Sequence, residues 1–238
     1  MESFNEYIDT SFDSKFEENE FYTWLPWIGR EYSKSKIKTL ILGESTYNWA
    51  VKSDTREKVK NRINQNNHLR IVHKNNAIDF NGKSPYARNI ERAIFLKKKT
   101  KRSDAHLLWT NVAYHNLVLR AMPTKKHRPK YEDYLAGWLT FIELTQSLNV
   151  EQCIVYGLEK NKLKSFKEAF DSKDIPYTFK KIKAGIGRSY PKSVNIKFKN
   201  KEIKVLFIRH PSSFFSWKKW GGILNKELNM ESIVASST

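Results

Sequence analysis

Short apolar runs alternate along the chain with longer amphipathic segments, and this alternation is the main clue to the fold. Apolar runs of four or five residues predict buried strands, whereas apolar residues spaced three and four apart predict helices that bury one face. The predicted strands are 38–42, 106–110, 152–156 and a hairpin of 193–198 with 202–209. The predicted helices are 54–65, 89–97, 131–148, 159–171 and 217–229. Strands that alternate with helices predict an α/β fold of three layers, α/β/α, around a central, mostly parallel, four-stranded sheet.

The chain shows no internal repeat and no clear linker, so we expect one domain over residues 1–238. Residues 1–32 form an acidic N-terminal segment, with eight acidic and two basic side chains. Aromatic residues recur within this segment, which predicts a helix that packs on the main domain.

The net charge of +18 indicates a polyanionic partner, and nucleic acid is the first candidate. A bias of composition towards lysine would spread the basic residues evenly. They are clustered instead, in 97–102, 125–130, 180–192 and 218–219. We therefore expect DNA, double- or single-stranded, as the partner.

The single cysteine, Cys153, lies in a predicted buried strand. One cysteine excludes a disulfide framework and a cysteine-ligated zinc or iron–sulfur site. No apolar run approaches transmembrane length, and the acidic N-terminus does not resemble a signal peptide. These features predict a soluble, cytoplasmic protein without membrane contact, which we expect to be a monomer.

Polar residues follow three of the predicted strands. The first strand leads into Gly43-Glu44-Ser45-Thr46-Tyr47, the second into Asn111, and the last into His210. Open α/β sheets bind their ligands at the carboxyl ends of the strands, so we expect these side chains to line one crevice. The alternative for the first segment is an ordinary strand-to-loop turn with Tyr47 as a core aromatic.

Two further segments have the character of a DNA contact. Ser84-Pro85-Tyr86-Ala87-Arg88 predicts a helix start, where a serine and free backbone amides bind an anion such as a phosphate. A helix start without a ligand is the alternative. The segment His210-Pro211-Ser212-Ser213-Phe214 places two serines and an exposed aromatic just after the last strand, and Phe214 would suit a wedge between stacked bases.

Four segments resemble the motifs of the uracil-DNA glycosylase superfamily and follow one another along the chain in the same order as those motifs. They are 43–47, 84–90, 107–111 and 208–215. In that resemblance Gly43 and Glu44 occupy the Gly-Gln/Glu positions, and Tyr47 the tyrosine that walls the base pocket. Asn111 would read the flipped pyrimidine, and Phe80 would stack on it. His210 would contact the pyrimidine O2, and Phe214 would enter the base stack. The remaining DNA contacts would come from Ser84, Pro85, Arg88 and Ser212, with Lys183 and Arg188 in a basic loop.

Ser45 departs from the family pattern, because one branch has a water-activating aspartate there. We therefore expect Glu44 to orient water or to stabilise the sugar cation, with His210 as the second catalytic residue. The resemblance implies a DNA glycosylase that needs no metal or cofactor and leaves an abasic site.

The resemblance leaves the target base and the setting open. Uracil is one reading and would fit DNA repair. Modified pyrimidines are the other, including 5-hydroxymethyluracil and the glucosylated hydroxymethylcytosine that phage-defence members of the superfamily remove. A non-catalytic DNA-binding module on the same fold is an alternative of a different class. A phosphate-handling α/β enzyme is more remote, because the sequence has no P-loop or Gly-x-Gly-x-x-Gly motif.

Overall fold

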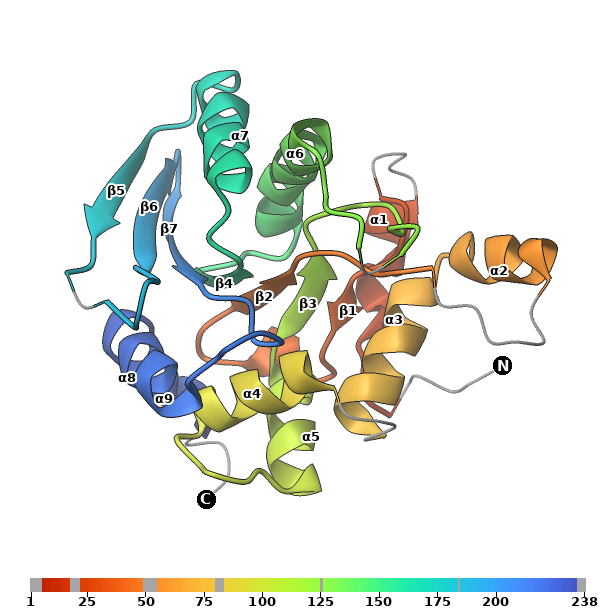
Figure 1. Ribbon diagram of the computed structural model, residues 1–238, viewed down its shortest axis with the longest axis horizontal. Coiled ribbons are helices and arrows are strands. Elements are labelled where there is room, and N and C mark those ends of the chain that lie inside the picture. Colours follow the sequence, from red (N-terminus) through yellow and green to blue (C-terminus); the bar gives the residue numbers. More distant parts are fainter. Residues whose placement is uncertain are drawn as a thin grey trace.

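The structure is a computed structural model that describes residues 6–17, 22–48, 55–79, 84–124, 126–183 and 185–234. A mixed sheet runs through the middle of this part of the chain, in the strand order β1-β3-β2-β4-β7-β6-β5 (Figure 1). The strands are β1 (Trp27–Ile28), β2 (Thr39–Gly43), β3 (Ala113–Asn116), β4 (Gln152–Tyr156), β5 (Tyr177–Lys181), β6 (Lys192–Phe198) and β7 (Lys201–Ile208).

The sheet confirms an α/β fold and corrects the predicted strand number. The four neighbours β3, β2, β4 and β7 are parallel to one another, but β1 and the β6–β5 pair extend the sheet with antiparallel strands to seven in the described residues. β1 has only two residues, and β5 reads Tyr-Thr-Phe-Lys-Lys with no fully buried position. Neither segment has the apolar run by which a buried strand is predicted.

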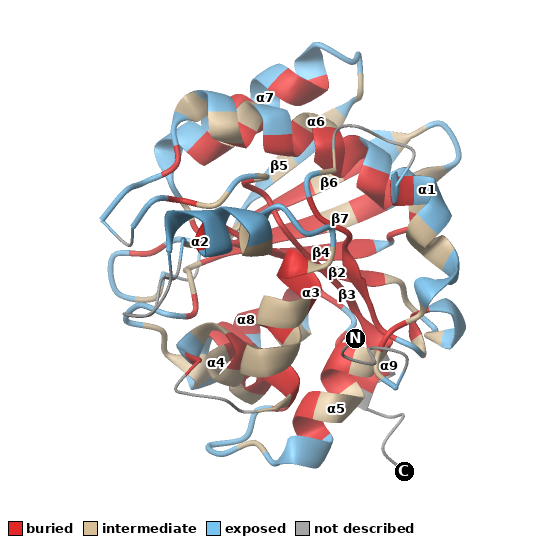
Figure 2. Cartoon of the chain, turned by 90° about the vertical axis from the view of Figure 1, so that its right-hand side faces the viewer, coloured by how far each residue is buried: buried red, intermediate tan, exposed pale blue. Residues whose placement is uncertain are grey.

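Helices cover both faces of the sheet. α6 (Tyr131–Ser147) and α7 (Lys160–Asp171) lie on one face, whereas α4 (Pro85–Ile94), α5 (Arg102–Asn111), α8 (Trp217–Glu227) and α9 (Glu231–Val234) lie on the other (Figure 1). Successive residues of a strand point to opposite faces, so Ile41 joins one core and its neighbours Leu40 and Leu42 join the other. Buried residues therefore follow the strands and the facing sides of these helices (Figure 2).

The described part of the N-terminal segment packs on the main body. It forms a 3-10 turn (Thr10–Phe12) and α1 (Asp13–Glu17), whose Phe16 is buried. Arg70 donates to both carboxylate oxygens of Asp13, at 2.6 and 2.8 Å. Arg70 lies in α3 (His68–His73), which continues as a π-helical turn (Lys74–Ile78); α2 (Arg56–Ile63) precedes it, and a second 3-10 turn spans Tyr32–Lys34.

The predicted strand 106–110 is wrong, because these residues belong to α5. The Asp104 side chain accepts from the backbone N–H of Lys101 at 2.8 Å and so caps the start of this helix. The strand of this region is β3, which begins two residues after the helix ends. The other predicted strands and helices are present, β4 with the predicted ends and the others with ends that are shifted. The expectation of a poorly defined loop after residue 65 is wrong, because α3 and the π-helical turn lie in this polar stretch. Within the described residues, no helix has the length and apolar character needed to cross a membrane.

Candidate functional site

A cleft lies at the carboxyl ends of β2, β3, β4 and β7. It consists of two adjoining cavities, of about 590 Å³ and about 720 Å³. The first cavity is bordered by the loop after β2, by α3, by the start of α4 and by the loop after β7. The second lies towards the starts of α6 and α7. Glu44, Arg128, His210 and Ser213 line both cavities and so mark the boundary between them.

Gly43 ends β2 where the chain has no room for a side chain. A Cβ atom at this position would lie 2.4 Å from Oδ1 of Asn116 and 2.5 Å from the hydroxyl of Tyr114. A glycine therefore allows the Asn116 amide to lie directly against the backbone of β2. This close approach joins the ends of the two neighbouring strands and fixes the position of Glu44 beside them.

Glu44 is a buried carboxylate with a buried cationic partner. Its Oε1 accepts from Nζ of Lys162 at 2.8 Å and from the hydroxyl of Tyr134 at 3.0 Å. Burial alone would raise the pKa of Glu44, but the Lys162 ammonium, with smaller contributions from His210 and Tyr134, holds that pKa below its usual range. Glu44 is therefore an anion at neutral pH, and no described residue donates to its second oxygen, Oε2.

Lys162 has no exposed surface, and its ammonium has three oxygen partners. It donates to Glu44, to the backbone oxygen of Tyr156 at 2.6 Å, and to the Glu159 carboxylate at 2.7 Å. Three acceptors match the three donors of an ammonium group, so each N–H of this buried side chain has an oxygen partner. The lysine thus fixes both the position and the ionisation of Glu44.

His210 follows β7 and is half-buried between the two cavities. Its Nδ1 accepts a hydrogen bond from the backbone N–H of Ser212 at 3.2 Å. Burial lowers the pKa of His210 below its usual value, against the opposing effect of the Glu44 carboxylate. The ring is therefore neutral at pH 7 and carries its proton on Nε2, for which the described residues offer no acceptor. This arrangement leaves one N–H donor for a ligand.

Asn116, at the end of β3, offers an oriented amide to the first cavity. Its Oδ1 accepts from the hydroxyl of Tyr114 at 2.9 Å, which leaves the Nδ2 group to donate. The sequence pattern indicates Asn116 only as a looser candidate than Asn111, because the strand Ala-Tyr-His-Asn is short and half polar, although all four residues are buried.

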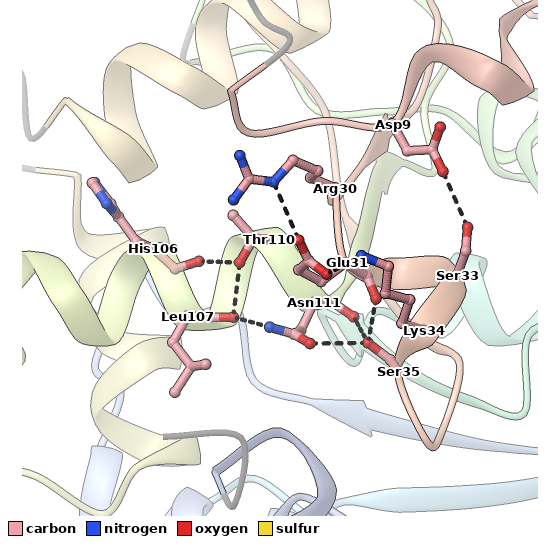
Figure 3. A network of polar contacts seen from close by, with 10 residues as sticks. All are labelled: Asp9, Arg30, Glu31, Ser33, Lys34, Ser35, His106, Leu107, Thr110 and Asn111. Atoms are coloured by element: carbon pink, nitrogen blue, oxygen red, sulfur yellow. Dashed lines mark hydrogen bonds and ion pairs between the residues drawn. The ribbon is translucent and has the colours of Figure 1, made fainter. Parts of the chain in front are cut away.

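Asn111, predicted to read a base, lies elsewhere. It ends α5 at the opposite edge of the sheet, before β3 begins. Its Nδ2 donates to the backbone oxygen of Leu107 at 2.9 Å, and its Oδ1 accepts from the hydroxyl of Ser35 at 3.1 Å (Figure 3). Both ends of the Asn111 amide are thus hydrogen-bonded within the fold, and Asn111 lines neither cavity. The prediction that Asn111 reads the base is therefore wrong.

Neutral rings line the side of the first cavity that faces α3 and α4. His73 stacks on Tyr114, with ring centroids 4.1 Å apart and an interplanar angle of 17°. Its Nδ1 lies 3.4 Å from the hydroxyl of Tyr86. Burial, reinforced by Arg88, holds the pKa of His73 well below its usual value, so the ring is neutral.

Three buried polar atoms of this cavity have no hydrogen-bond partner among the described residues. They are Nε2 of His73, the hydroxyl of Tyr156 and Oγ1 of Thr46. A buried polar group without a partner costs about 1–3 kcal/mol. These three atoms have less than 1 Å² of exposed surface, as do the unpartnered atoms of Ser193 and Trp220 away from the cavity, so the groups presented to a ligand are those of Asn116 and His210.

The loop after His210 presents an aromatic side chain to solvent. Phe214 is 90% exposed, and its φ of 47° lies in the left-handed region that most residues avoid. Arg209 holds the loop: its Nε donates to the backbone oxygen of Ser213 at 2.8 Å, and its guanidinium lies 5.4 Å from the centre of the Phe214 ring. The fold thus maintains an exposed apolar side chain at the mouth of the cleft.

The other predicted site residues are distributed as follows. Ser45, Tyr47, Ser84, Pro85 and Ser212 line the first cavity. The Ser84 hydroxyl donates to Oδ1 of Asn76. Arg88 points inward, to Glu91 at 2.8 Å and to the backbone oxygen of Ala77 at 2.5 Å, so it is not presented at the cleft as a DNA contact. Lys183 and Arg188 are exposed and line neither cavity, and Phe80 lies outside the described residues.

Within the described part of the chain, no group of three or more His, Cys, Asp or Glu side chains is arranged to hold a metal ion. The chain matched no protein-family model, and a search of curated proteins gave no match either.

Proposed function

We propose that this protein is a DNA glycosylase that turns a pyrimidine nucleotide out of DNA and hydrolyses its N-glycosidic bond. One observation carries the proposal: an ionised carboxylate, Glu44, and a neutral imidazole with a free N–H, His210, border the same cavity. The resemblance to the uracil-DNA glycosylase superfamily supports it at Gly43–Tyr47 and at His210–Phe214. Asn116 takes the base-reading role that the resemblance assigned to Asn111.

In the proposed reaction the bond between C1′ and the base nitrogen breaks first. The electron pair goes to the base, whose O2 becomes anionic and accepts from Nε2–H of His210. Removing one such donor typically lowers a rate about 10²–10³-fold. The sugar becomes an oxocarbenium-like cation, and the fixed negative charge of Glu44 stabilises it. Water then adds to C1′, and its proton passes through the Glu44 carboxylate to the base anion, leaving an abasic site.

The charge and shape of the mouth support DNA as the substrate. Arg128, Lys160 and Arg209 line the second cavity, where they suit the phosphodiester on either side of the extruded nucleotide. Phe214 is suited to fill the space that this nucleotide leaves in the base stack. The net charge of +18 is in keeping with such a partner.

A substituted pyrimidine is favoured over plain uracil as the excised base. The first cavity, at about 590 Å³, falls in the range of roughly 300–1,000 Å³ that holds drug-sized ligands. A single pyrimidine ring leaves much of this space empty. The remaining space would hold a substituent on the base, as in hydroxymethylated or glucosylated bases.

Base release from three matched DNAs tests the proposal. The DNAs contain uracil, 5-hydroxymethyluracil or glucosylated hydroxymethylcytosine, and alkali cleavage reports abasic sites. We expect cleavage of at least one DNA by the wild type and a loss of about 100-fold or more in His210→Ala. Base release from the uracil-containing DNA alone would contradict the proposal that the excised base is a substituted pyrimidine. If all three DNAs stay intact while the protein binds them, the non-catalytic DNA-binding module replaces the enzyme.

A further inference from the structure

A groove lies apart from the cleft, beside the outermost strand β5 and against α7. It measures about 740 Å³, and we call it the β5 groove. Four lysines line it, Lys167, Lys180, Lys181 and Lys192, together with the aromatic rings of Phe179 and Tyr190. No acidic side chain of the described residues lines it. The groove thus combines positive charge with aromatic surface.

Two of these lysines face each other without a counter-charge. Lys181 and Lys192 are direct partners in the pairing of β5 with β6, and no described carboxylate forms an ion pair with either. Like charges opposite one another on a sheet are destabilising. Lys180, by contrast, lies 3.5 Å from the Glu227 carboxylate. An anion between Lys181 and Lys192 would remove their repulsion, so the groove fits a negatively charged ligand.

The aromatic side chains of the groove indicate which class of anion it would bind. The Tyr190 ring is 58% exposed and packs over Gly185, where a Cβ would lie 2.9 Å from the ring. Phe179 is half-buried, with Nζ of Lys167 5.4 Å from its ring centre. An exposed ring beside lysines, such as that of Tyr190, is the kind of surface on which unpaired bases stack while the phosphates contact the lysines. A duplex hides its base faces, and an acidic peptide has no bases to stack.

The groove is connected to the cleft through a short piece of chain. Tyr190 follows Ser189, whose hydroxyl accepts from the Arg209 guanidinium at 3.1 Å. Ser189 and Arg209 both line the second cavity. A strand that leaves the second cavity would therefore meet Tyr190 and the two opposed lysines next.

We propose that the β5 groove binds single-stranded DNA as a second site that continues the cleft. This goes beyond the proposed function, because it requires binding outside the cleft and no chemistry. Base excision could fail while the groove still binds DNA, and the reverse also holds.

The test measures the binding of fluorescent oligothymidine to the full-length chain by anisotropy over a range of salt. The groove variants are the double substitution Lys181→Gln with Lys192→Gln, and Tyr190→Ala. The control is Lys58→Gln with Lys60→Gln, which removes the same charge from two exposed lysines of α2, outside the basic clusters. Thermal unfolding of each variant checks that the fold is retained.

We expect each groove variant to bind oligothymidine about tenfold more weakly than the control. The double lysine variant should also reduce the slope of log affinity against log salt by roughly 1.4. Groove variants that bind like the control would overturn the proposal. A loss from the lysine variant that is equal for a duplex or for polyglutamate, with no loss from Tyr190→Ala, would also overturn it, in favour of a general polyanion or an acidic protein.

Discussion

The two sides of the first cavity differ in charge. On the side of α6 and α7, Glu44 and the buried Lys162 form an ion pair. On the side of α3 and α4, His73, Tyr86 and Tyr114 meet as neutral rings. Under the proposed function, charge is kept where the glycosidic bond breaks, and neutral hydrogen-bonding groups are kept where the base is recognised.

Each side also has a buried carboxyl group, and the two groups ionise differently. Glu44 has a pKa below its usual range because of Lys162. Glu91 lies behind the neutral side, where it accepts from Nε1 of Trp109 at 2.7 Å and pairs with Arg88. Burial raises its pKa to about 7, in spite of Arg88 and these hydrogen bonds. A nearby cation is thus not sufficient by itself: at Glu44 the Lys162 ammonium and its hydrogen bond outweigh the effect of burial, whereas at Glu91 burial outweighs Arg88.

The largest effect is expected from Lys162→Met, which removes the cation of the charged side. Glu44 would then be a buried carboxylate without a counter-charge, which costs about 3–5 kcal/mol of stability and raises its pKa. We expect excision at pH 7 to fall about 100-fold and to recover partly as the pH is raised, because a carboxyl with a raised pKa ionises only at higher pH. Excision rates from pH 5 to 9 and urea unfolding measure the two effects.

The double variant Lys162→Met with Glu44→Gln is the matched control. It removes both charges, so stability should return towards the wild type while excision stays low. An active double variant would show that the ionised carboxylate has no part in the reaction.

The next effect concerns Glu91 and the pH dependence of stability. Its folded pKa of about 7 lies above the ordinary 4.5, so the folded protein binds more protons than the unfolded chain between these values. The free energy of unfolding should therefore fall by about 3 kcal/mol from this group as the pH rises from 4.5 to 7, and then level off. Urea unfolding of the wild type and Glu91→Gln at pH 5 and pH 8 isolates this change. Equal differences between the two proteins at both pH values would contradict it.

Two asparagine variants compare Asn116, which is proposed to recognise the base, with Asn111, whose amide is hydrogen-bonded within the fold. Asn116→Ala should lower kcat/KM for excision by roughly 10- to 100-fold, since a base would lose a buried hydrogen bond. Asn111→Ala should leave kcat/KM within about twofold and cost only about 1 kcal/mol of stability, because its amide bonds Leu107 and Ser35. Steady-state kinetics on one DNA decides the assignment, and a larger kinetic loss in the Asn111 variant would reverse it.

The smallest effect is expected from a substitution of Phe214 at the mouth of the cleft, because it changes neither the charged nor the neutral side of the first cavity. Phe214→Ala should slow excision from duplex DNA about tenfold, which corresponds to about 1.4 kcal/mol of unstacking that the wedge no longer offsets. Excision from single-stranded DNA should be unchanged, as should stability, within about 0.5 kcal/mol, because the side chain is 90% exposed. Equal losses on both DNAs would assign Phe214 to the cavity rather than to the base stack.

The charged side was only half predictable from the sequence. Glu44 and His210 follow clear apolar strands, so their place at the carboxyl edge could be predicted. Lys162 could not, because it stands in a segment, Lys-Asn-Lys-Leu-Lys, in which every lysine has the same local pattern. Only the packing of α7 against α6 distinguishes the one that is buried.

The neutral side was less predictable for a different reason. The run Leu-Leu-Trp is compatible with a strand or a buried helix, and it forms a helix here. The strand that follows contains Tyr, His and Asn, which are buried because neighbouring strands and aromatic rings satisfy them. His73 lies in a polar stretch whose helix is stabilised by tertiary contacts, such as Arg70 with Asp13.

Under the proposed function, the pairing of Glu44 with Lys162 also bears on which newly made chains can excise a base. The two residues are 118 positions apart, and His210 comes later still. A ribosome-bound chain that lacks α7 has no buried ammonium to ionise Glu44, and one that lacks the end of β7 has no imidazole. Under the proposed function, base excision therefore requires that both α7 and the end of β7 have been synthesised and folded, so a product truncated before His210 would not excise bases.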